Sequence, residues 1–312
     1  MYPKSKSKFR GKKVIFIILV FFIILIIGII IARLSNNVDK GISNEIAVIQ
    51  IKGVISFSDS GIPFQGRTAN AQTILDNIEK VKTRDVKAVI FEIESPGGTV
   101  VASKEIAEAI RKLDKPKVAF IREVGASGAY WIAASADKIV ADDLSITGSI
   151  GVVSSYLDFY EFLNKYGVEY NRLIAGKYKD IGSPFKDLTK EERNILQKKL
   201  DIVHEVFINY IKERRNLKEE EVKRIETGEF FLGREAKELN LIDYTGNKEL
   251  AIKIAKDLAN IKEAKITELK EKRTLLDLFS SYSSEVFYYM GRGIGAEITN
   301  IKVRDSNLEL IA

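Results

Sequence analysis

The sequence predicts a layered α/β fold built from repeated strand, turn and helix units with right-handed crossovers. Two observations predict it. Between residues 46 and 136, apolar and β-branched runs alternate with amphipathic or alanine-rich segments. Glycine-containing turns stand where two of the helices open. Repetition of this kind packs helices against a sheet, and 312 residues give ample length for a buried core.

The predicted elements follow one another in order along the chain. The first three are a strand at 46–55, an amphipathic helix at 69–83 and a buried strand at 86–95. The next three are a glycine turn and helix within 96–114, a strand at 115–123 and a helix that opens near Ser127.

A long helix is predicted at 189–216. It begins with a capping box, in which Thr189 precedes Glu192 by three residues. Its apolar stripe, expected to pack on the core, consists of Leu196, Leu200, Val203, Phe207 and Ile211. His204, the single histidine of the sequence, lies at the border of that stripe, where a structural role is the ordinary expectation.

An uncleaved membrane anchor is predicted at 14–32. This run contains no charged side chain, and at about 1.5 Å per residue it is long enough to cross a hydrocarbon core of roughly 30 Å. A cleaved signal peptide is the alternative, but the run is longer than the usual apolar region and ends without a small-residue cleavage site. Residues 1–13 carry six basic side chains and should stay in the cytoplasm. The chain is therefore expected to be a single-pass protein of the cell membrane, with a linker at 33–45 and an extracytoplasmic folded domain.

Composition excludes several kinds of site. The sequence has no cysteine, so disulfides, thiolate catalysis and cysteine-based metal sites are excluded, and one histidine makes a multi-histidine zinc site improbable. The formal net charge of +6 equals the six basic residues of the N-terminal flank, so the rest of the chain is formally neutral. A neutral domain lacks the basic face that nucleic acid binding requires.

Two turns are candidates for a functional site. Parallel α/β folds bind ligands at the carboxyl ends of strands, where backbone N–H groups are exposed. The segments ESPGGTV (94–100) and VGASGAY (124–130) stand at such positions. In the first, Gly97 and Gly98 allow close approach of the backbone to a ligand. An ordinary structural turn is the alternative.

Ser127 lies between a predicted strand and a predicted helix. Its surroundings resemble a nucleophile elbow, although Ala129 stands where the G-x-S-x-G pattern has glycine. Unpaired N–H groups at the helix start would suit a developing oxyanion. The alternative is a simple N-cap serine, and the motif alone leaves both open.

A serine nucleophile needs a base, and the sequence offers His204 or a lysine. Lys177 and Lys179 lie in a glycine-flanked loop within 174–192, where a solvated surface position is the ordinary alternative. A lysine base must be neutral, so its pKa of about 10.4 must fall by roughly three units, or about 4 kcal/mol. Burial in an apolar cleft can supply that shift, but spacing alone does not choose between the two lysines.

Four motifs stand in order behind the anchor. They are SPGG at 95–98, GASGAYWIAA at 125–134, TGSIGV at 147–152 and KYKDIGSPF at 177–185. Together they resemble the short, single-copy form of signal peptide peptidase A, over roughly residues 46–260. The departures are small: Thr99 and Trp131 replace commoner residues at positions that touch no proposed catalytic atom.

The resemblance implies a Clp protease/crotonase fold and a serine protease with a Ser-Lys dyad, with residues 46–260 as the peptidase domain. On the matching positions, Ser127 is the nucleophile, Lys179 the general base and Ser149 the residue that positions the lysine. Gly97 or Gly98 would donate an N–H to the oxyanion. No metal or organic cofactor is implied.

The resemblance also implies a substrate and a partner. The substrates would be released signal peptides, cut within their apolar segments at the lipid bilayer. Relatives with two fused copies of the domain divide the dyad between the halves. A single-copy chain would then form a cyclic homo-oligomer, in which Ser127 of one subunit meets Lys179 of its neighbour.

Alternatives to this function stay open. They are a related membrane serine protease acting on stomatin-like partners, a crotonase-type acyl-CoA enzyme and a non-catalytic membrane scaffold of the same fold. Residues 261–312 are expected to form a C-terminal helix and tail, with an apolar stripe at helical spacing within 274–290. An ordinary packed helix is the alternative for this stripe. We expect the tail beyond it to visit the peptide groove, where it is either trimmed or only bound.

Overall fold

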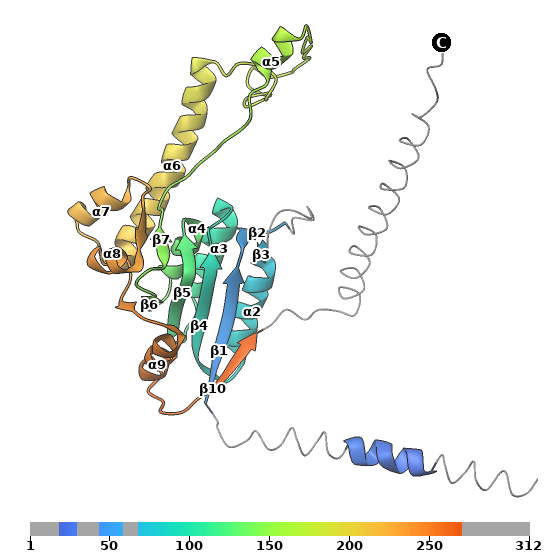
Figure 1. The fold of residues 1–312 in the computed structure, drawn as a ribbon, viewed down its shortest axis with the longest axis vertical. Coiled ribbons are helices and arrows are strands. Elements are labelled where there is room, and N and C mark those ends of the chain that lie inside the picture. The colour runs from blue at the N-terminus through green and yellow to red at the C-terminus, as the bar shows by residue number, and fades with distance from the viewer. Residues whose placement is uncertain (1–18, 30–43, 59–67, 270–312) are drawn as a thin grey trace, which may run out of the picture. The chain divides into compact units, whose positions relative to one another are not determined.

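A mostly parallel β-sheet forms the centre of the computed structural model, which describes residues 19–29, 44–58 and 68–269. Within these residues the sheet has eight strands, and helices lie against both of its faces (Figure 1). This architecture confirms the predicted α/β class.

The strands of the sheet follow the order β10, β1, β4, β5, β6 and β9, and each neighbouring pair is parallel. β6 pairs with the first half of β5, and β7 pairs with the carboxyl end of β5 and antiparallel to β8. β2 and β3 form a separate parallel pair. The bounds are β1 Glu45–Lys52, β2 Val54–Ser56, β3 Thr68–Asn70, β4 Val86–Ser95, β5 Lys117–Ala126, β6 Lys138–Ala141, β7 Ile146–Gly148, β8 Phe230–Leu232, β9 Tyr244–Thr245 and β10 Lys265–Leu269.

The four helices predicted in this part of the chain are present as α2, α3, α4 and α6, and four others, α5, α7, α8 and α9, were not predicted. The helices bound to the body of the fold are α2 Ala71–Thr83, α3 Val100–Arg111, α4 Gly128–Ala133, α7 Glu219–Ile225, α8 Gly233–Glu238 and α9 Lys248–Leu258. Two more, α5 Tyr160–Lys165 and α6 Lys190–Arg215, lie in a projecting segment. α6 begins with the predicted capping box of Thr189 and Glu192. β10 pairs with β1, so the sheet extends past the expected domain boundary at residue 260.

Both faces of the central strands are buried. In β4, Val89, Phe91 and Ile93 belong to the core beneath α2, α3 and α4, whereas Ala88 and Ile90 belong to the core beneath α9. A parallel strand buried on both faces needs apolar residues in succession rather than in alternation. This explains the unbroken apolar stretch at 88–91, and β4 coincides with the predicted strand.

The short helix α4 is wholly buried and fixes the end of β5. All six of its residues are buried. The ring of Trp131 stacks on Phe207 of α6 at 4.4 Å between centroids, and Tyr130 Oη donates a hydrogen bond of 2.7 Å to the carbonyl oxygen of Leu241. Burial raises the pKa of the Tyr130 phenol, so this group stays a donor. These contacts fix α4 and therefore the turn at Ser127, which directly precedes it.

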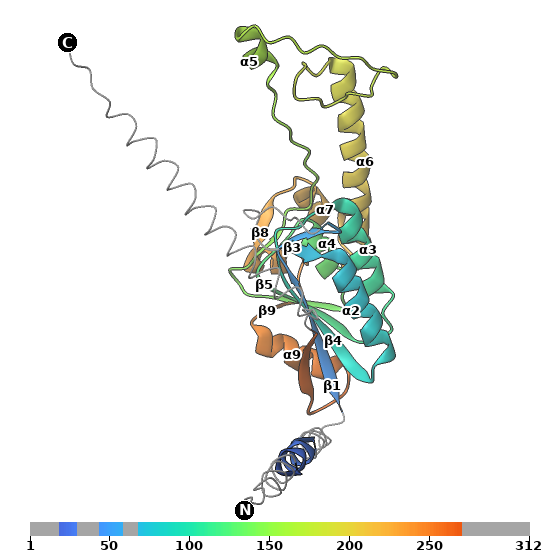
Figure 2. The same cartoon turned by 90° about the vertical axis from the view of Figure 1, so that its right-hand side faces the viewer.

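Residues 151–189, which we call the arm, run from β7 to the start of α6. The arm includes α5, which lies at the end of α6 remote from the sheet in both views (Figures 1 and 2). Not one residue of the arm is buried. Arg172 pairs with Asp180, and the ring of Tyr170 lies 5.4 Å from that of Phe185. The arm is therefore held by its own contacts rather than by the core.

The predicted packing of the α6 stripe is correct only toward the C-terminal end of the helix. Phe207 and Ile211 are buried, but Leu196 and Leu200 are only half-buried. The cause is that the first turns of α6 extend beyond the body to carry the arm, where the core does not reach (Figure 2). Periodicity reports an apolar face but not what covers it.

The predicted membrane anchor lies only partly within the described residues. Residues 19–29 are helical, with exposed side chains, and the remainder of 14–32 lies outside the described part. Among the helices that the structure describes, none is both long and apolar enough to cross a bilayer. The predicted C-terminal helix and tail, from residue 270 onward, also lie outside the described residues.

Replacing Tyr130 by Phe should lower the free energy of unfolding by about 1–3 kcal/mol, because the buried carbonyl of Leu241 loses its donor. Urea unfolding followed by circular dichroism measures this change. The matched control is Tyr166→Phe, at an exposed tyrosine of the arm, which should change stability by less than about 0.5 kcal/mol. Equal effects of the two substitutions would contradict the anchoring role of Tyr130.

Candidate active site

Ser127 occupies a strained turn between β5 and α4. Its backbone has φ 53° and ψ −125°, a region that non-glycine residues rarely adopt and that costs about 1–3 kcal/mol. The Ser127 N–H donates a hydrogen bond of 2.8 Å to the Gly148 carbonyl, and the Ser127 carbonyl accepts one of 2.9 Å from Tyr130 N–H. The Ser127 side chain makes no N-cap hydrogen bond. Ser127 therefore stands at the N-cap position of α4 without capping the helix through its side chain, and the helix does not use the hydroxyl of this half-buried residue.

The proline-glycine turn after β4 lies directly against Ser127. Gly97 has φ +105°, and a Cβ at this position would stand 3.0 Å from Ser127 Cβ and 2.9 Å from Gly128 N. A Cβ on Gly98 would stand 2.0 Å from the carbonyl oxygen of Ile55. Glycine is thus needed at both positions because other backbone lies where a side chain would be.

Two backbone N–H groups remain free at this point. Gly97 N–H donates to Ser95 Oγ at 3.1 Å. For Gly98 N–H and Gly128 N–H, no hydrogen bond is formed with any group that the structure describes. The two glycines adjoin, since a Cβ on Gly128 would lie 3.4 Å from Gly98 N. Paired free donors next to a serine hydroxyl can stabilise an oxyanion.

Ser149 lies beside Ser127 because β7 pairs with the end of β5. Its φ is 49°, also strained, and its N–H donates to the Glu229 carbonyl at 2.9 Å. In the same segment, Thr147 Oγ1 donates to the Gly125 carbonyl at 2.8 Å. These bonds fix the TGSIGV motif against the turn that holds Ser127.

Ser127 and Ser149 line one cavity of about 340 Å³. His204 lines it too, with Nε2 3.2 Å from the Ile150 carbonyl oxygen. The cavity is completed by Gly151, Val152, Val153, Gln197, Leu200, Asp201, Glu226, Thr227 and Gly228. This lining includes two carboxylates and no lysine or arginine.

Lys179 lies apart from this cavity. It belongs to the exposed loop of the arm, where its N–H donates to the Gly176 carbonyl at 3.1 Å. Its ammonium makes no ion pair within the described residues, whereas Lys177 Nζ lies 2.7 Å from Glu191. The hydrogen bond to Glu191, followed by that to Tyr178, raises the pKa of Lys177. The fold therefore brings together Ser127, Ser149, Gly97 and Gly98, but not the lysine of the same chain.

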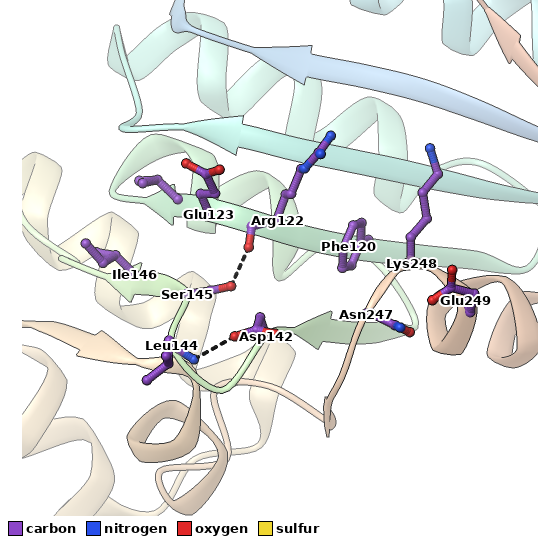
Figure 3. A pocket seen from close by; sticks show the side chains of 11 residues that line it. Phe120, Arg122, Glu123, Asp142, Leu144, Ser145, Ile146, Asn247, Lys248 and Glu249 are labelled. Atoms are coloured by element: carbon purple, nitrogen blue, oxygen red, sulfur yellow. Dashed lines mark hydrogen bonds between the residues drawn. The ribbon is translucent and has the colours of Figure 1, made fainter.

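A larger cavity, of about 820 Å³, lies elsewhere and contains none of these residues (Figure 3). It is lined by Arg122 and Lys248, which lie 3.5 and 2.8 Å from the buried carboxylate of Glu92. Burial opposes the charge of Glu92, but Lys248 and Lys52 outweigh it and hold its pKa below the ordinary value. This network neutralises a buried charge, and it offers no strained or unpartnered nucleophile.

Two residues of the site were not identified from the sequence. Ser95 is fully buried and shapes the glycine turn through its bond to Gly97 N–H; the serine before proline was a signal for this role. Glu229 contributes only its backbone carbonyl, which no sequence pattern reveals.

The fold and the site together have the features of a serine hydrolase. Comparison with known proteins agrees. Residues 109–262 match the model of peptidase family S49. A candidate protease of Methanocaldococcus jannaschii is 36% identical over 305 residues, which cover 93% of this chain and 95% of the relative.

Two further relatives carry the name that the motifs suggested. A candidate signal peptide peptidase A of Enterococcus faecium is 33% identical over 77% of this chain and 71% of its own length. A chloroplastic serine protease of the same name from Arabidopsis thaliana is 32% identical, and the match covers 78% of this chain but 37% of that longer protein. The chain belongs to peptidase family S49 and is a serine protease, which confirms the resemblance to signal peptide peptidase A.

Replacing Gly97 by Ala should slow the labelling of Ser127 by a fluorophosphonate probe by about 10-fold or more. The added methyl group would displace Ser127 or Gly128, and small displacements of reacting groups cost this much. Gly246→Ala is the control, because its methyl group would meet only the flexible side chain of Leu250. Labelling of Gly97→Ala at the parent rate would contradict the close approach.

Proposed function

We propose that the protein is a membrane-anchored endopeptidase of the Clp protease/crotonase fold that degrades released signal peptides within their apolar segments, using a Ser-Lys dyad. The observation that carries the proposal is the strained Ser127, whose hydroxyl faces a cavity and caps no helix. Strain of this kind persists where the surroundings impose it, typically at reactive sites.

In this mechanism the lysine takes the proton of Ser127 Oγ as that oxygen attacks the scissile carbonyl. The C–N bond then breaks, the lysine gives the proton to the leaving amine, and water hydrolyses the acyl-enzyme to release the second fragment and restore the serine. The free N–H groups of Gly98 and Gly128 would receive the developing oxyanion. Gly97 was the other candidate donor, but its N–H is already bonded to Ser95. Gly97 instead keeps the turn close to the nucleophile.

Lys179 is the base that best fits the contacts of the arm. Glu191 favours the charged form of Lys177, which is the wrong state for accepting a proton. No carboxylate is paired with Lys179 in the described residues, so its ammonium can meet another surface without breaking an ion pair. The motif and the ion pairs therefore favour the same lysine.

A second copy of the chain would supply that lysine. The arm exposes apolar side chains without covering them: Val153 is 87% exposed, Leu157 71% and Leu173 fully exposed. Exposed apolar surface on this scale is typical of an interface. The Ser127 cavity, which has two carboxylates and no lysine or arginine, suits a cation from elsewhere. Successive copies, each offering its arm to the next cavity, would form a cyclic oligomer.

The substrate and the location rest on different support. The Enterococcus faecium relative is named as a signal peptide peptidase, and an apolar peptide would add to the burial that a neutral lysine requires. The apolar run at 14–32 supports membrane anchoring, with residues 1–13 in the cytoplasm and the catalytic domain outside it. An anchor would concentrate the enzyme where released signal peptides lie.

Replacing Ser127 or Lys179 by Ala should lower the hydrolysis of a detergent-solubilised signal peptide by at least about 10²-fold, because nucleophile and base act as one unit. Lys177→Ala, in the same loop, is the matched control and should retain most of the rate. Mass spectrometry of the fragments measures both rate and cleavage position. A Lys179→Ala enzyme with the parent rate would rule out this base, and unchanged cleavage by Ser127→Ala would rule out the nucleophile.

Mixing two inactive variants tests whether the dyad is shared. Ser127→Ala and Lys179→Ala chains should each be inactive alone. In randomly mixed oligomers, about a quarter of shared sites would pair an intact serine with an intact lysine and recover activity. Mixed oligomers, verified by two affinity tags, that stay inactive would show that the dyad lies within one subunit.

A further inference from the structure

His204 joins two parts of the chain that meet beside the nucleophile. It lies on α6, after the arm has returned to the body, and its Nε2 is 3.2 Å from the carbonyl oxygen of Ile150, where the arm departs. A carbonyl oxygen can only accept, so Nε2 carries the hydrogen. This bond therefore closes the base of the arm next to the Ser127 cavity.

Residues 148–150 are each held by a hydrogen bond to another part of the chain, and we call these three bonds anchors. The His204 bond is the third anchor. The Gly148 carbonyl accepts from Ser127 N–H, the Ser149 N–H donates to the Glu229 carbonyl, and the Ile150 carbonyl accepts from His204. The first two anchors are backbone groups, which any sequence would provide. The third depends on one side chain.

Ser149, in the middle of this set, is strained. Its φ of 49° is held only if the residues on both sides are fixed, since a single residue in this region gains about 1–3 kcal/mol by relaxing. Removal of the His204 donor would free the peptide that follows Ser149. The hydroxyl of Ser149 would then lose its fixed direction within the cavity.

The alternative is that His204 itself is the general base. A histidine base needs a partner that orients its ring, usually a carboxylate. Asp201 and Glu226 line the same cavity, but His204 makes no hydrogen bond to either one. Its hydrogen-bond partner is the backbone carbonyl of Ile150. Nε2 is therefore engaged by the backbone rather than by Ser127.

We propose that His204 is a positioning residue: it holds the Ile150 carbonyl and so fixes Ser149, which in turn orients the catalytic lysine toward Ser127. This inference rests on the proposed Ser-Lys function. It assigns to the single histidine of the chain a role in the rate of the chemical step rather than in substrate binding. The effect should therefore fall on kcat and leave KM nearly unchanged.

The test compares three substitutions in the full-length membrane protein. His204→Leu removes the donor, His204→Asn keeps an amide that is too short, and His204→Gln places an amide N–H near the original Nε2. We expect kcat for signal peptide hydrolysis to fall about 10- to 100-fold in the Leu and Asn variants and to stay within about threefold of the parent in the Gln variant. Glu205→Leu, at the next and exposed residue of α6, is the control for helix stability.

The outcomes separate the possible roles. A lysine base gives a rate that rises with pH as its neutral fraction grows. The expected order of kcat, with unchanged KM and this alkaline rise retained in the Gln variant, supports positioning. A folded Gln variant as slow as Leu, with the alkaline rise lost, would overturn it in favour of a histidine base. Parent kcat in both Leu and Asn variants, or a change in KM alone, would also overturn it. The proposed dyad is tested separately. If Lys179→Ala keeps full activity in an otherwise unchanged chain, the dyad is wrong whatever the His204 variants do.

Discussion

The meeting of three backbone segments at Ser127 is the constraint on which the rest of the site depends. The end of β5, the glycine turn after β4 and the end of β7 approach so closely that a Cβ at Gly97 would lie 3.0 Å from that of Ser127. The strained φ of Ser127 persists because α4, directly after it, is wholly buried and is held by Trp131 and Tyr130. Core packing thus produces the backbone geometry of the half-buried Ser127.

The same constraint explains which features the sequence could predict. Continuous apolar runs and glycine turns identified β4, β5 and the turn at Ser127, because parallel strands buried on both faces must be apolar and close backbones exclude side chains. The packing of α6 was only half predicted, since an apolar stripe does not say which surface covers it. The neighbourhood of His204 was missed, because its partner is a backbone carbonyl 54 positions earlier in the chain.

The arm leaves the sheet directly beside the site, and none of its residues is buried. A segment that exposes Val153 and Leu173 gains little stability within its own chain, so its order comes from short-range pairs such as Lys186 with Glu192 at 2.5 Å. Those pairs also distinguish the two lysines of the loop. Lys177 is bound to Glu191 and contributes to the shape of the loop, which leaves Lys179 unpaired in the described residues and able to meet another surface.

A lysine base in this cavity would face opposing electrostatic effects. Its pKa must fall by roughly three units, or about 4 kcal/mol, yet Asp201 and Glu226 line the cavity and favour the charged form. At an effective dielectric constant of about 20, a carboxylate about 4 Å away would contribute about 4 kcal/mol in the wrong direction, and at about 8 Å only half of that. Under the proposed function, the carboxylates can attract the incoming ammonium, but the lysine must finally lie on the serine side of the cavity. Under the same proposal, a rigid Ser149 would hold it there, which is why the anchors on either side of Ser149 would matter for the chemistry.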